Sequence, residues 1–367
     1  MKSNLLSDSS MTLIDESIVA QVNLLSYPDR FCYTISHDDQ KIHVRYRDNE
    51  QPSVWSLRNT DGQLTLEPID AISQQPSATE LLAVIEAALL CYPAQKEVTL
   101  TVVRSRFPEL FAAGVLTADG NRVIVYAEVF WQLPRLWHQR GSDAPYPIRY
   151  GFSQGQRHPL RPPKPSGLVY RRYIPWLEST LNFRRVVIDN DLQRFNCWMN
   201  DPVVAAFWQE TGDMQKHRAY LEMIDADPHM LNLIGCLNDE PFGYFEVYWA
   251  KEDRIAPFYD AHDFDRGWHV LIGEPQMRGK PFVTAWLPSI SHYLFLDDCR
   301  TQRIVIEPRI DNLKMMRNLA YGGYGSLKEF DFPHKRAALH MLLRERFFSE
   351  QLWVPRSAVT THSLSLS

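Results

Sequence analysis

The sequence is poor in cysteine and has no cysteine motif. It holds five cysteines in 367 residues, and none belongs to a Cys-x-x-Cys pair; they are Cys32, Cys91, Cys197, Cys236 and Cys299. An odd, scattered set supports neither a disulfide framework nor a zinc knuckle. We therefore expect small buried thiols in a reducing compartment, and no metal site.

Long apolar runs and an excess of positive charge are also missing. No stretch approaches the roughly 18 apolar residues that a membrane span needs. The N-terminus, Met1-Lys2-Ser3-Asn4, lacks the apolar core of an export signal. The net charge of −5 gives no overall attraction to nucleic acid or to an anionic membrane. These absences predict a cytoplasmic protein with neither nucleic acid nor a membrane as its partner.

The sequence does contain enough apolar material for more than one core. It is 45% hydrophobic and 12% aromatic, and a chain of this length ordinarily divides into two domains. Strand patterns at 41–47 and 63–69 and a helical face at 79–90 predict that a small α+β domain comes first. The predicted division is a flexible N-terminus at 1–25, a non-catalytic α+β domain at 26–145, a Pro-rich linker at 146–166, a second domain at 167–352 and a flexible C-terminus at 353–367.

Three basic residues of the proline-rich connector, Arg157, Arg161 and Lys164, allow two interpretations. They can contact a phosphate, or they can be ordinary charges of a solvated linker. The proline and glycine content around them favours the solvated linker.

The second domain has the pattern of a mixed α and β structure. Helical spacing occurs at 190–200 and 215–224, a hairpin pattern at 231–237 and 243–249, and an acidic, aromatic loop at 251–265. Pro288 should kink or restart the helix that begins near 280. Periodicity alone predicts a final helix at 336–347.

The stretch from 267 to 312 carries the candidate chemistry. Its pattern is strand, glycine turn, helix, strand and helix, with His269 in the first strand and Glu307 at the end of the second. A turn that opens a helix presents N–H groups and the positive end of the helix dipole to an anion such as a phosphate. Arg278 and Lys280 add positive charge there. The glycine patterns of P-loops and of dinucleotide folds are absent, which sets those two classes of site aside.

His269 and Glu307 each have a structural role as the alternative to a chemical one. A histidine in an apolar strand is often a hydrogen-bonded core residue. The carboxylate-rich loop before His269 and the turn after it instead favour a cleft, where the ring can take a proton near neutral pH. Glu307 can pair with Arg303 or Arg309, but Pro308 ends its strand and leaves the carboxylate at the lip of a sheet. If the two strands are adjacent, both side chains meet in one cleft.

Several stretches of the second domain form a specific series when taken together. They include Phe195-Asn196-x-Trp198-Met199-Asn200-Asp201-Pro202 and Gly267-Trp268-His269-Val270-Leu271-Ile272-Gly273-Glu274, with further stretches at 206–208, 241–249, 253–260, 278–279, 307–312 and 330–336. Over about residues 167–348 the chain resembles the hydroxamate-siderophore N-acyltransferases. These enzymes belong to the GCN5-related N-acyltransferase (GNAT) superfamily and act on lysine, N-hydroxylysine or related hydroxylated diamines. Trp131-Gln132-Leu133-Pro134 is similar to longer members that carry an extra N-terminal domain.

The resemblance implies an α+β chain with a GNAT fold in its C-terminal domain. That fold is a mixed, mostly antiparallel sheet flanked by helices, and it makes the segment from Arg336 a strand. The resemblance also implies that His269 and Glu307 are the catalytic pair, although short members usually have Asp at the second position. Acyl-CoA, with an acetyl or succinyl group, is implied to bind Val270, Leu271, Ile272, Arg278, Gly279, Lys280 and Asn312. Pro281 departs from the superfamily pattern and removes one N–H from the turn.

The implied acceptor is a small N-hydroxylated amine. Residues that suit its alkyl chain and a cationic far end are Trp208, Tyr244, Glu246, Tyr248, Phe258 and Asp260. The hypothesis is direct acyl transfer, in which the N–H groups of Val270 and Leu271 polarise the thioester carbonyl. The hydroxylamine then attacks, His269 accepts the proton, and Glu307 orients or assists it.

Other functions stay open at this point. One is a general amine or lysine N-acetyltransferase. Another is a non-catalytic binder of acyl-CoA or of a siderophore precursor, which the Pro281 departure and the first domain suggest. That first domain is either a degenerate copy of the same fold or a dimerisation platform, so a homodimer is also open. The acyl group and the parent amine (lysine, cadaverine, putrescine or ornithine) are not determined.

Overall fold

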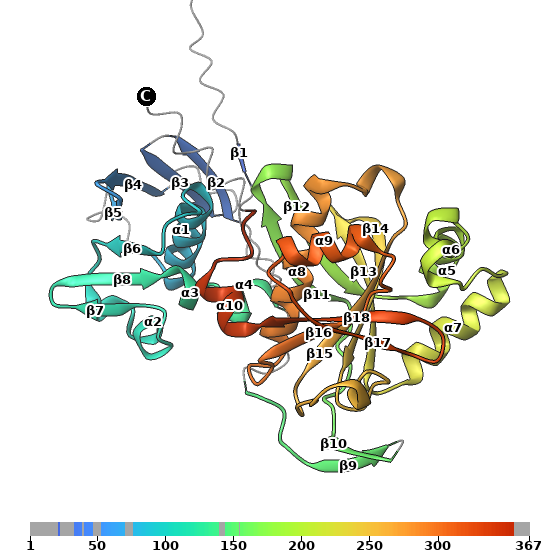
Figure 1. Cartoon of the computed structure of the whole chain (residues 1–367). Coiled ribbons are helices and arrows are strands. Elements are labelled where there is room, and N and C mark those ends of the chain that lie inside the picture. Colours follow the sequence, from blue (N-terminus) through green and yellow to red (C-terminus); the bar gives the residue numbers. More distant parts are fainter. Residues whose placement is uncertain are drawn as a thin grey trace, which may run out of the picture.

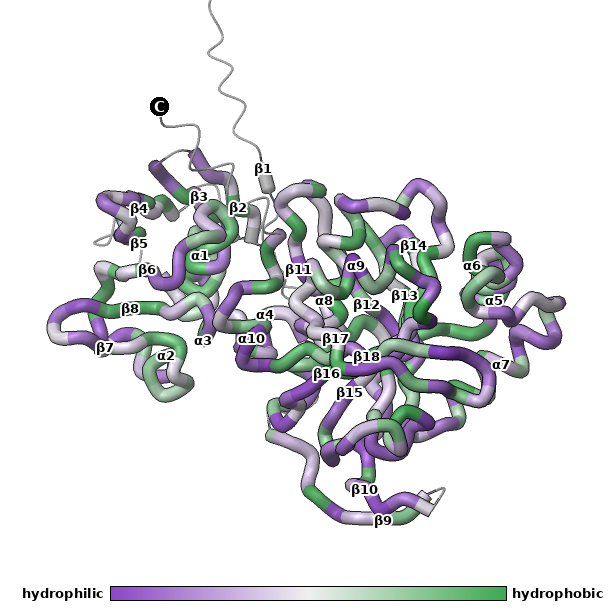
Figure 2. The backbone as a smooth tube through the Cα atoms, in the orientation of Figure 1, coloured by the Kyte–Doolittle hydropathy of each residue, from purple (hydrophilic) through white to green (hydrophobic). Residues whose placement is uncertain are grey.

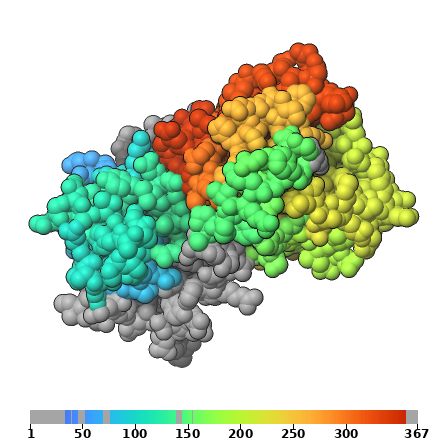
Figure 3. Space-filling view, turned by 90° about the horizontal axis from the view of Figure 1, so that it is seen from below, coloured from blue at the N-terminus to red at the C-terminus, as the bar shows by residue number. Residues whose placement is uncertain are grey.

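The computed structural model describes residues 21–22, 33–38, 40–46, 53–69, 76–138, 144–153 and 155–355. These residues form two halves that lie side by side (Figure 1). Each half is built on an eight-stranded sheet, and the two sheets have the same strand order. Figure 2 shows that apolar stretches alternate with hydrophilic ones, the latter mainly on outer strands and loops. The space-filling view in Figure 3 shows two lobes in direct contact.

The N-terminal half, residues 21–126, is a sheet covered by one long helix. Ser77 caps that helix by accepting the N–H of Glu80, and the helix buries Leu81, Val84 and Ile85. The elements are β1 (Gln21–Val22), β2 (Tyr33–Asp38), β3 (Lys41–Tyr46), β4 (Ser53–Thr60), β5 (Gln63–Pro68), α1 (Ala78–Cys91), β6 (Glu97–Leu100), α2 (Pro108–Ala112), β7 (Thr117–Asp119) and β8 (Arg122–Tyr126).

The C-terminal half, residues 168–355, carries the segment with the candidate chemistry. Its sheet is antiparallel except where β15 pairs with β16. The elements are β11 (Leu168–Ile174), β12 (Ser179–Arg185), α5 (Ile188–Met199), α6 (Pro202–Trp208), α7 (Met214–Ala226), β13 (Met230–Leu237), β14 (Glu240–Trp249), β15 (Arg266–Ile272), α8 (Lys280–Asp297), β16 (Arg303–Ile306), α9 (Leu313–Tyr321), β17 (Gly325–Asp331), β18 (Arg336–Leu343) and α10 (Arg344–Ser349).

The two sheets correspond strand for strand. The N-terminal order is β1-β2-β3-β4-β5-β6-β8-β7 and the C-terminal order is β11-β12-β13-β14-β15-β16-β18-β17. In both, the fifth and sixth strands form the parallel pair, and a helix connects them. The C-terminal half inserts α5, α6 and α7 between its second and third strands, whereas β2 and β3 form a hairpin. The N-terminal half is thus a shorter copy of the same arrangement.

The halves are joined by a buried aromatic cluster. Trp131 stacks on Trp137, with ring centroids 4.6 Å apart, and on Trp353, at 5.1 Å. His292 of α8 donates its Nε2–H to the carbonyl of Trp131 at 2.6 Å. Trp131 directly follows the short helix α3 (Ala127–Phe130), and Trp137 is the last residue of the short helix α4 (Pro134–Trp137). The prediction that a flexible C-terminus begins at 353 is wrong, because Trp353 is buried in this cluster.

The Pro-rich connector is a docked segment and contains the hairpin of β9 (Tyr150–Ser153) and β10 (Gln156–Pro159). Arg161 is buried, and its Nε donates to Glu252 Oε1 at 2.6 Å. Lys164 Nζ donates to the carbonyl of Asp225 at 2.6 Å. Arg157 lies over the ring of Tyr150. The interpretation as a solvated linker is therefore wrong for Arg161 and Lys164, whereas Arg157 is exposed, and these contacts engage the cations that were considered for a phosphate.

Two helix predictions also need correction. Helix α8 runs through Pro288, so the predicted restart is wrong, and the alternative of a kink stays a prediction. The hydroxyl of Ser291 donates to the carbonyl of Leu287 in the same helix. The closing segment is strand β18 from Arg336 to Leu343 and only then helix α10. The family resemblance therefore predicted strand β18 correctly, and the helix that periodicity predicted is confined to α10. Among the described residues, no helix is long and apolar enough to cross a membrane.

Candidate active site

The site is built on β15, which lies between β14 and β16. Its pairing with β14 runs along the whole strand, from Trp249↔Arg266 to Gly243↔Ile272. Its parallel pairing with β16 stops after Arg266↔Ile304 and Gly267↔Val305. From Trp268 onward, β15 therefore presents an edge with no strand partner, where backbone N–H and C=O groups are available to a ligand.

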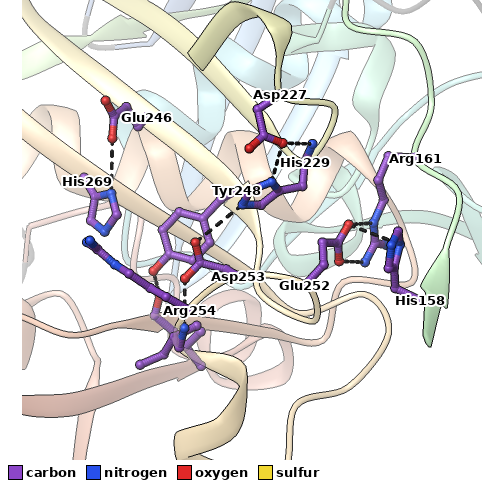
Figure 4. A network of polar contacts seen from close by, with 12 residues as sticks. His158, Arg161, Asp227, His229, Glu246, Tyr248, Glu252, Asp253, Arg254 and His269 are labelled. Atoms are coloured by element: carbon purple, nitrogen blue, oxygen red, sulfur yellow. Dashed lines mark hydrogen bonds and ion pairs between the residues drawn. The ribbon is translucent and has the colours of Figure 1, made fainter. Parts of the chain in front are cut away.

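His269 lies between two carboxylates at the start of this open edge. Its Nε2 is 3.0 Å from Oε1 of Glu307, the residue that follows β16. Its Nδ1 is 3.3 Å from Oε2 of Glu246, its cross-strand partner on β14. The His269 side chain is 21% exposed, whereas Glu246 is 4% and Glu307 is 0% exposed. The ring is thus the most exposed of the three side chains; Figure 4 shows it facing Glu246.

The two carboxylates determine the charge of the ring. Burial alone would lower the pKa of His269, but the negative charges of Glu307 and Glu246 outweigh burial and raise that pKa to about 9. Burial would raise the pKa of Glu307, but the imidazolium of His269, with Lys335 and Arg254, holds that pKa well below its usual range. At neutral pH the site therefore contains an imidazolium held between carboxylates.

Three tyrosines fix the positions of these carboxylates. Tyr220 and Tyr244 donate their hydroxyls to Glu246 Oε1, at 2.6 and 3.0 Å. Tyr248 donates to Glu307 Oε2 at 2.9 Å. Burial and the adjacent carboxylates raise the pKa of all three tyrosines, so they remain neutral donors. Gly267 makes room for this arrangement, because a Cβ there would lie 2.1 Å from the ring of Tyr248.

Two cavities meet at β15. The first, of about 670 Å3, follows the open edge and the start of α8. The second cavity, of about 1070 Å3, is lined by His269, Glu246 and Glu307 among other residues. Five residues line both cavities and mark the junction, namely Phe207, Trp208, Val270, Asn312 and Met315. A donor bound in the first cavity and an acceptor bound in the second would meet beside His269.

All seven residues predicted to bind acyl-CoA line the first cavity. The side chain of Arg278 is already engaged, because its Nε donates to the Ile272 carbonyl at 3.0 Å and Nη2 lies 3.1 Å from Asp201 Oδ1. It therefore supports the turn, and the prediction that its guanidinium meets a pyrophosphate is not supported by these contacts. The Asn312 side chain accepts the N–H of Met315 and so caps α9.

The backbone of β15 offers one N–H beside His269 on its open edge. The carbonyl of Val270 faces that edge, because Trp208 Nε1 donates to it at 3.2 Å. Both polar groups of one strand residue point to the same side, so the Val270 N–H also faces the open edge and that of Leu271 faces β14. The prediction that Leu271 also polarises a carbonyl is therefore wrong.

The residues predicted to form the acceptor wall divide into three groups. Trp208 and Glu246 line the second cavity. Tyr244 and Tyr248 are fully buried behind it and act on the carboxylates. The other two predictions are wrong. Phe258 packs against Phe330 and Phe332, with ring centroids 4.6 and 4.8 Å away, and Asp260 lines a separate cavity of about 530 Å3.

Sequence reasoning missed Tyr220 and the basic residues Arg254, His334 and Lys335 of the second cavity. The alternation of Tyr244, Glu246 and Tyr248 was the available signal for one polar face of β14. For Tyr220, on an amphipathic helix, the local sequence contained no signal. In the described part of the chain, no group of three or more His, Cys, Asp or Glu side chains is arranged to hold a metal ion, and the absence of a metal stays a prediction.

Replacing Glu246 should change the titration of His269. In Glu246→Gln one of the two negative charges is lost, so the pKa of His269 should fall from about 9 toward the ordinary value of about 6.5. The measurement is a histidine-selective NMR titration. The control is Glu240→Gln, the same change at an exposed position of the same strand, which should leave the pKa near 9. An unshifted His269 in Glu246→Gln would contradict this electrostatic account.

Comparisons with known proteins agree with this geometry. The model of the acetyltransferase (GNAT) domain family matches residues 187–332. A Schizosaccharomyces pombe protein that carries the name lysine N-acyltransferase is 49% identical over 63% of this chain and 69% of its own length. The N(6)-hydroxylysine O-acetyltransferase of Escherichia coli is 44% identical over 62% of this chain and 72% of its own length.

A longer fungal relative is also similar. The N(5)-hydroxyornithine:cis-anhydromevalonyl coenzyme A-N(5)-transacylase of Beauveria bassiana is 46% identical over 56% of this chain and 46% of its own length. The chain thus belongs to the siderophore N-acyltransferase family of the GNAT superfamily. It is an acyltransferase of the GNAT fold, and the residues that match the domain model lie in its C-terminal half.

Proposed function

We propose that the protein transfers an acyl group from acyl-CoA to the hydroxylamino nitrogen of a small N-hydroxylated amine and so forms a hydroxamate. The observation that carries the proposal is the junction of the two cavities at His269 and Val270. The names of the relatives support the acceptor class, since they specify hydroxylysine and hydroxyornithine.

The acyl-CoA is placed along the open edge of β15. Its thioester carbonyl accepts the N–H of Val270, which stabilises the negative charge that develops on the carbonyl oxygen in the transition state. Its phosphates lie at the start of α8, where the N–H groups of Gly279 and Lys280 and the Lys280 ammonium are available. Pro281 has no N–H to add there.

The protonated state of His269 changes the predicted proton path. A hydroxylamine is less basic than an alkyl amine, so its nitrogen is uncharged and can attack without prior deprotonation. The new C–N bond makes the nitrogen cationic and acidic. His269 passes its Nε2 proton to Glu307 and takes the proton from nitrogen, the C–S bond breaks, and the pair gives one proton to the CoA thiolate, so the proton lost by nitrogen is balanced by the one gained by sulfur. Glu307, whose pKa the imidazolium holds low, thus receives the proton only in passing, a reversal of the predicted roles.

The catalytic centre is proposed to lie in the C-terminal half alone. When the two halves are aligned at the starts of β6 and β16, Ser56, Glu67 and Thr101 take the positions of Glu246, His269 and Glu307. In the N-terminal half the parallel pairing also continues further, since Thr101 N–H donates to the Leu66 carbonyl at 2.9 Å. The three positions of that half thus hold no histidine, and its two parallel strands separate later than β15 and β16 do.

Release of free CoA thiol tests this function. With acetyl-CoA, N-hydroxylysine should be acylated at least about tenfold faster than lysine at neutral pH, because the amine of lysine is protonated and must first lose a proton. Equal rates with both acceptors would favour a general amine acetyltransferase. Binding of acyl-CoA with no thiol release from any acceptor would favour a non-catalytic binder.

A further inference from the structure

The acceptor cavity has a basic corner whose charges the reaction described above does not use. Most charged side chains around this cavity are paired with one another. Arg309 Nη2 donates to Asp311 at 2.5 Å, and Arg336 Nη2 donates to Glu329 at 3.2 Å. On the acidic side, Glu210 pairs with Lys216. The basic corner consists of the remaining cations, Arg254 and Lys335, with the His334 ring beside them.

Arg254 is the least engaged member of the corner. Its guanidinium makes no hydrogen bond to any other described residue. Its nearest carboxylate oxygen is Glu307 Oε1, at 3.8 Å, and its side chain is 51% exposed. Figure 4 shows it beside His269 and Tyr248. These two residues belong to strands β15 and β14, whereas Arg254 lies on the segment that connects the two strands. Arg254 lines the cavity, and its five N–H donors have no hydrogen-bonded acceptor among the described residues.

Lys335 extends the positive charge, and the lowered pKa of His334 leaves that ring a neutral neighbour at neutral pH. Lys335 Nζ donates to the backbone carbonyl of Glu307 at 2.8 Å and lies 3.7 Å from its carboxylate. Burial, followed by the charge of Arg254, lowers the pKa of His334, and Lys335 has a lowered pKa through burial and the same neighbour. Glu307 is the one carboxylate of the cavity in contact with the corner, and it is already committed to His269 and Tyr248.

We propose that the basic corner binds a carboxylate carried by one of the two reactants, with Arg254 as its main ligand. The proposal rests on the proposed function, because it assigns a further group of the substrate to the same cavity. Guanidinium groups match carboxylates in a two-bond geometry. The carboxylate has two sources, the amino-acid head of the acceptor and the acid end of a dicarboxylic acyl group such as succinyl.

A crossed assay distinguishes the two sources. Acceptors are N-hydroxylysine and N-hydroxycadaverine, which differ only by the carboxylate. Donors are acetyl-CoA and succinyl-CoA, which differ in the same way. In one of the two comparisons, we expect kcat/KM to be at least about tenfold higher for the carboxylate-bearing member. The reason is that a charge-assisted hydrogen bond strengthens binding by about that factor. The comparison that shows the preference identifies the source.

The variants are Arg254→Gln and Lys335→Gln. Each should reduce the carboxylate preference, by about tenfold for Arg254→Gln, and a general loss of rate cancels in the ratio. The matched control is Arg336→Gln, a cation of the same cavity that pairs with Glu329, and this variant should keep the preference. Equal kcat/KM in both comparisons, or a preference that survives in both variants, overturns the proposal.

A binding measurement keeps this test separate from the proposed function. If no acceptor is acylated with either donor, the proposed function fails. Calorimetry with the same four compounds then tests whether the basic corner binds a carboxylate. Tighter binding of one carboxylate-bearing compound to the wild type than to Arg254→Gln supports the corner. Equal affinities for the members of both pairs overturn it.

Discussion

His269→Ala should lower kcat by about 10² to 10⁴-fold, the range expected when a positioned proton-transfer group is removed. The KM for acyl-CoA should change little. His269 is the most exposed member of the charged trio in the acceptor cavity, whereas acyl-CoA is placed along the backbone of β15 and at the start of α8. Steady-state kinetics with acyl-CoA and N-hydroxylysine measure both constants.

The control for this variant is His262→Ala. His262 is an exposed histidine of the loop before β15, and it lies outside the two cavities that meet at His269. It should keep the wild-type kcat. If His269→Ala turned over at the wild-type rate, or if its defect were confined to KM, His269 would have no part in proton transfer.

Glu307→Gln should lower kcat by about 10²-fold or more, because the substitution keeps the shape of the side chain and removes the charge that receives the proton. In the wild-type protein His269 Nε2 lies 3.0 Å from Oε1 of Glu307. An amide at this position has no capacity to accept the proton from Nε2. Glu307→Asp keeps the charge but retracts it by one methylene, so it should lose less activity than Glu307→Gln. The order of kcat should be Glu, then Asp, then Gln.

Glu329→Gln is the matched control for this series. Glu329 is an exposed carboxylate of β17 that pairs with Arg336 at the surface, so its loss should leave kcat unchanged. A Glu307→Gln enzyme within about threefold of the wild type would contradict the role of this carboxylate. Equal activity of the Asp and Gln variants would show that position, and not charge, is what matters.

The meeting of His269 and Glu307 could be predicted because His269 lies in one short, strongly patterned strand and Glu307 directly follows another, with a helix between the two strands. A strand, helix and parallel strand bring the two strand ends to one edge of a sheet. The charge of the pair could not be predicted in the same way. It depends on Glu246, which reaches His269 through the β14–β15 register, and one residue of slip would turn that side chain to the other face.

Contacts between distant parts of the chain explain the other differences. Arg161 is buried because it pairs with Glu252, and Trp353 is buried because it stacks on Trp131. The local sequence around Arg161 and Trp353 is polar and rich in proline, and it contains no sign of the distant partners Glu252 and Trp131. Phe258 was likewise predicted to line the acceptor cavity, but Phe330 and Phe332 take it into a neighbouring cluster.

The proposed division of labour between the halves follows from the shared strand order. A second copy of the arrangement retains the sheet but has Ser56, Glu67 and Thr101 where the chemistry needs two carboxylates and a histidine. The two halves share a buried cluster of Trp131, Trp137 and Trp353. The N-terminal half thus supports the catalytic half through α8 and the C-terminal segment. A homodimer stays a prediction.

The most direct test of the central claim is the identity of the product. Incubation of the wild-type protein with acetyl-CoA and N-hydroxylysine should yield a hydroxamate, which forms a coloured complex with ferric iron, in an amount equal to the free CoA released. Mass spectrometry should place the acetyl group on nitrogen. CoA release accompanied by an O-acetyl product that gives no ferric colour, or by acetylation of the α-amine alone, would contradict the account.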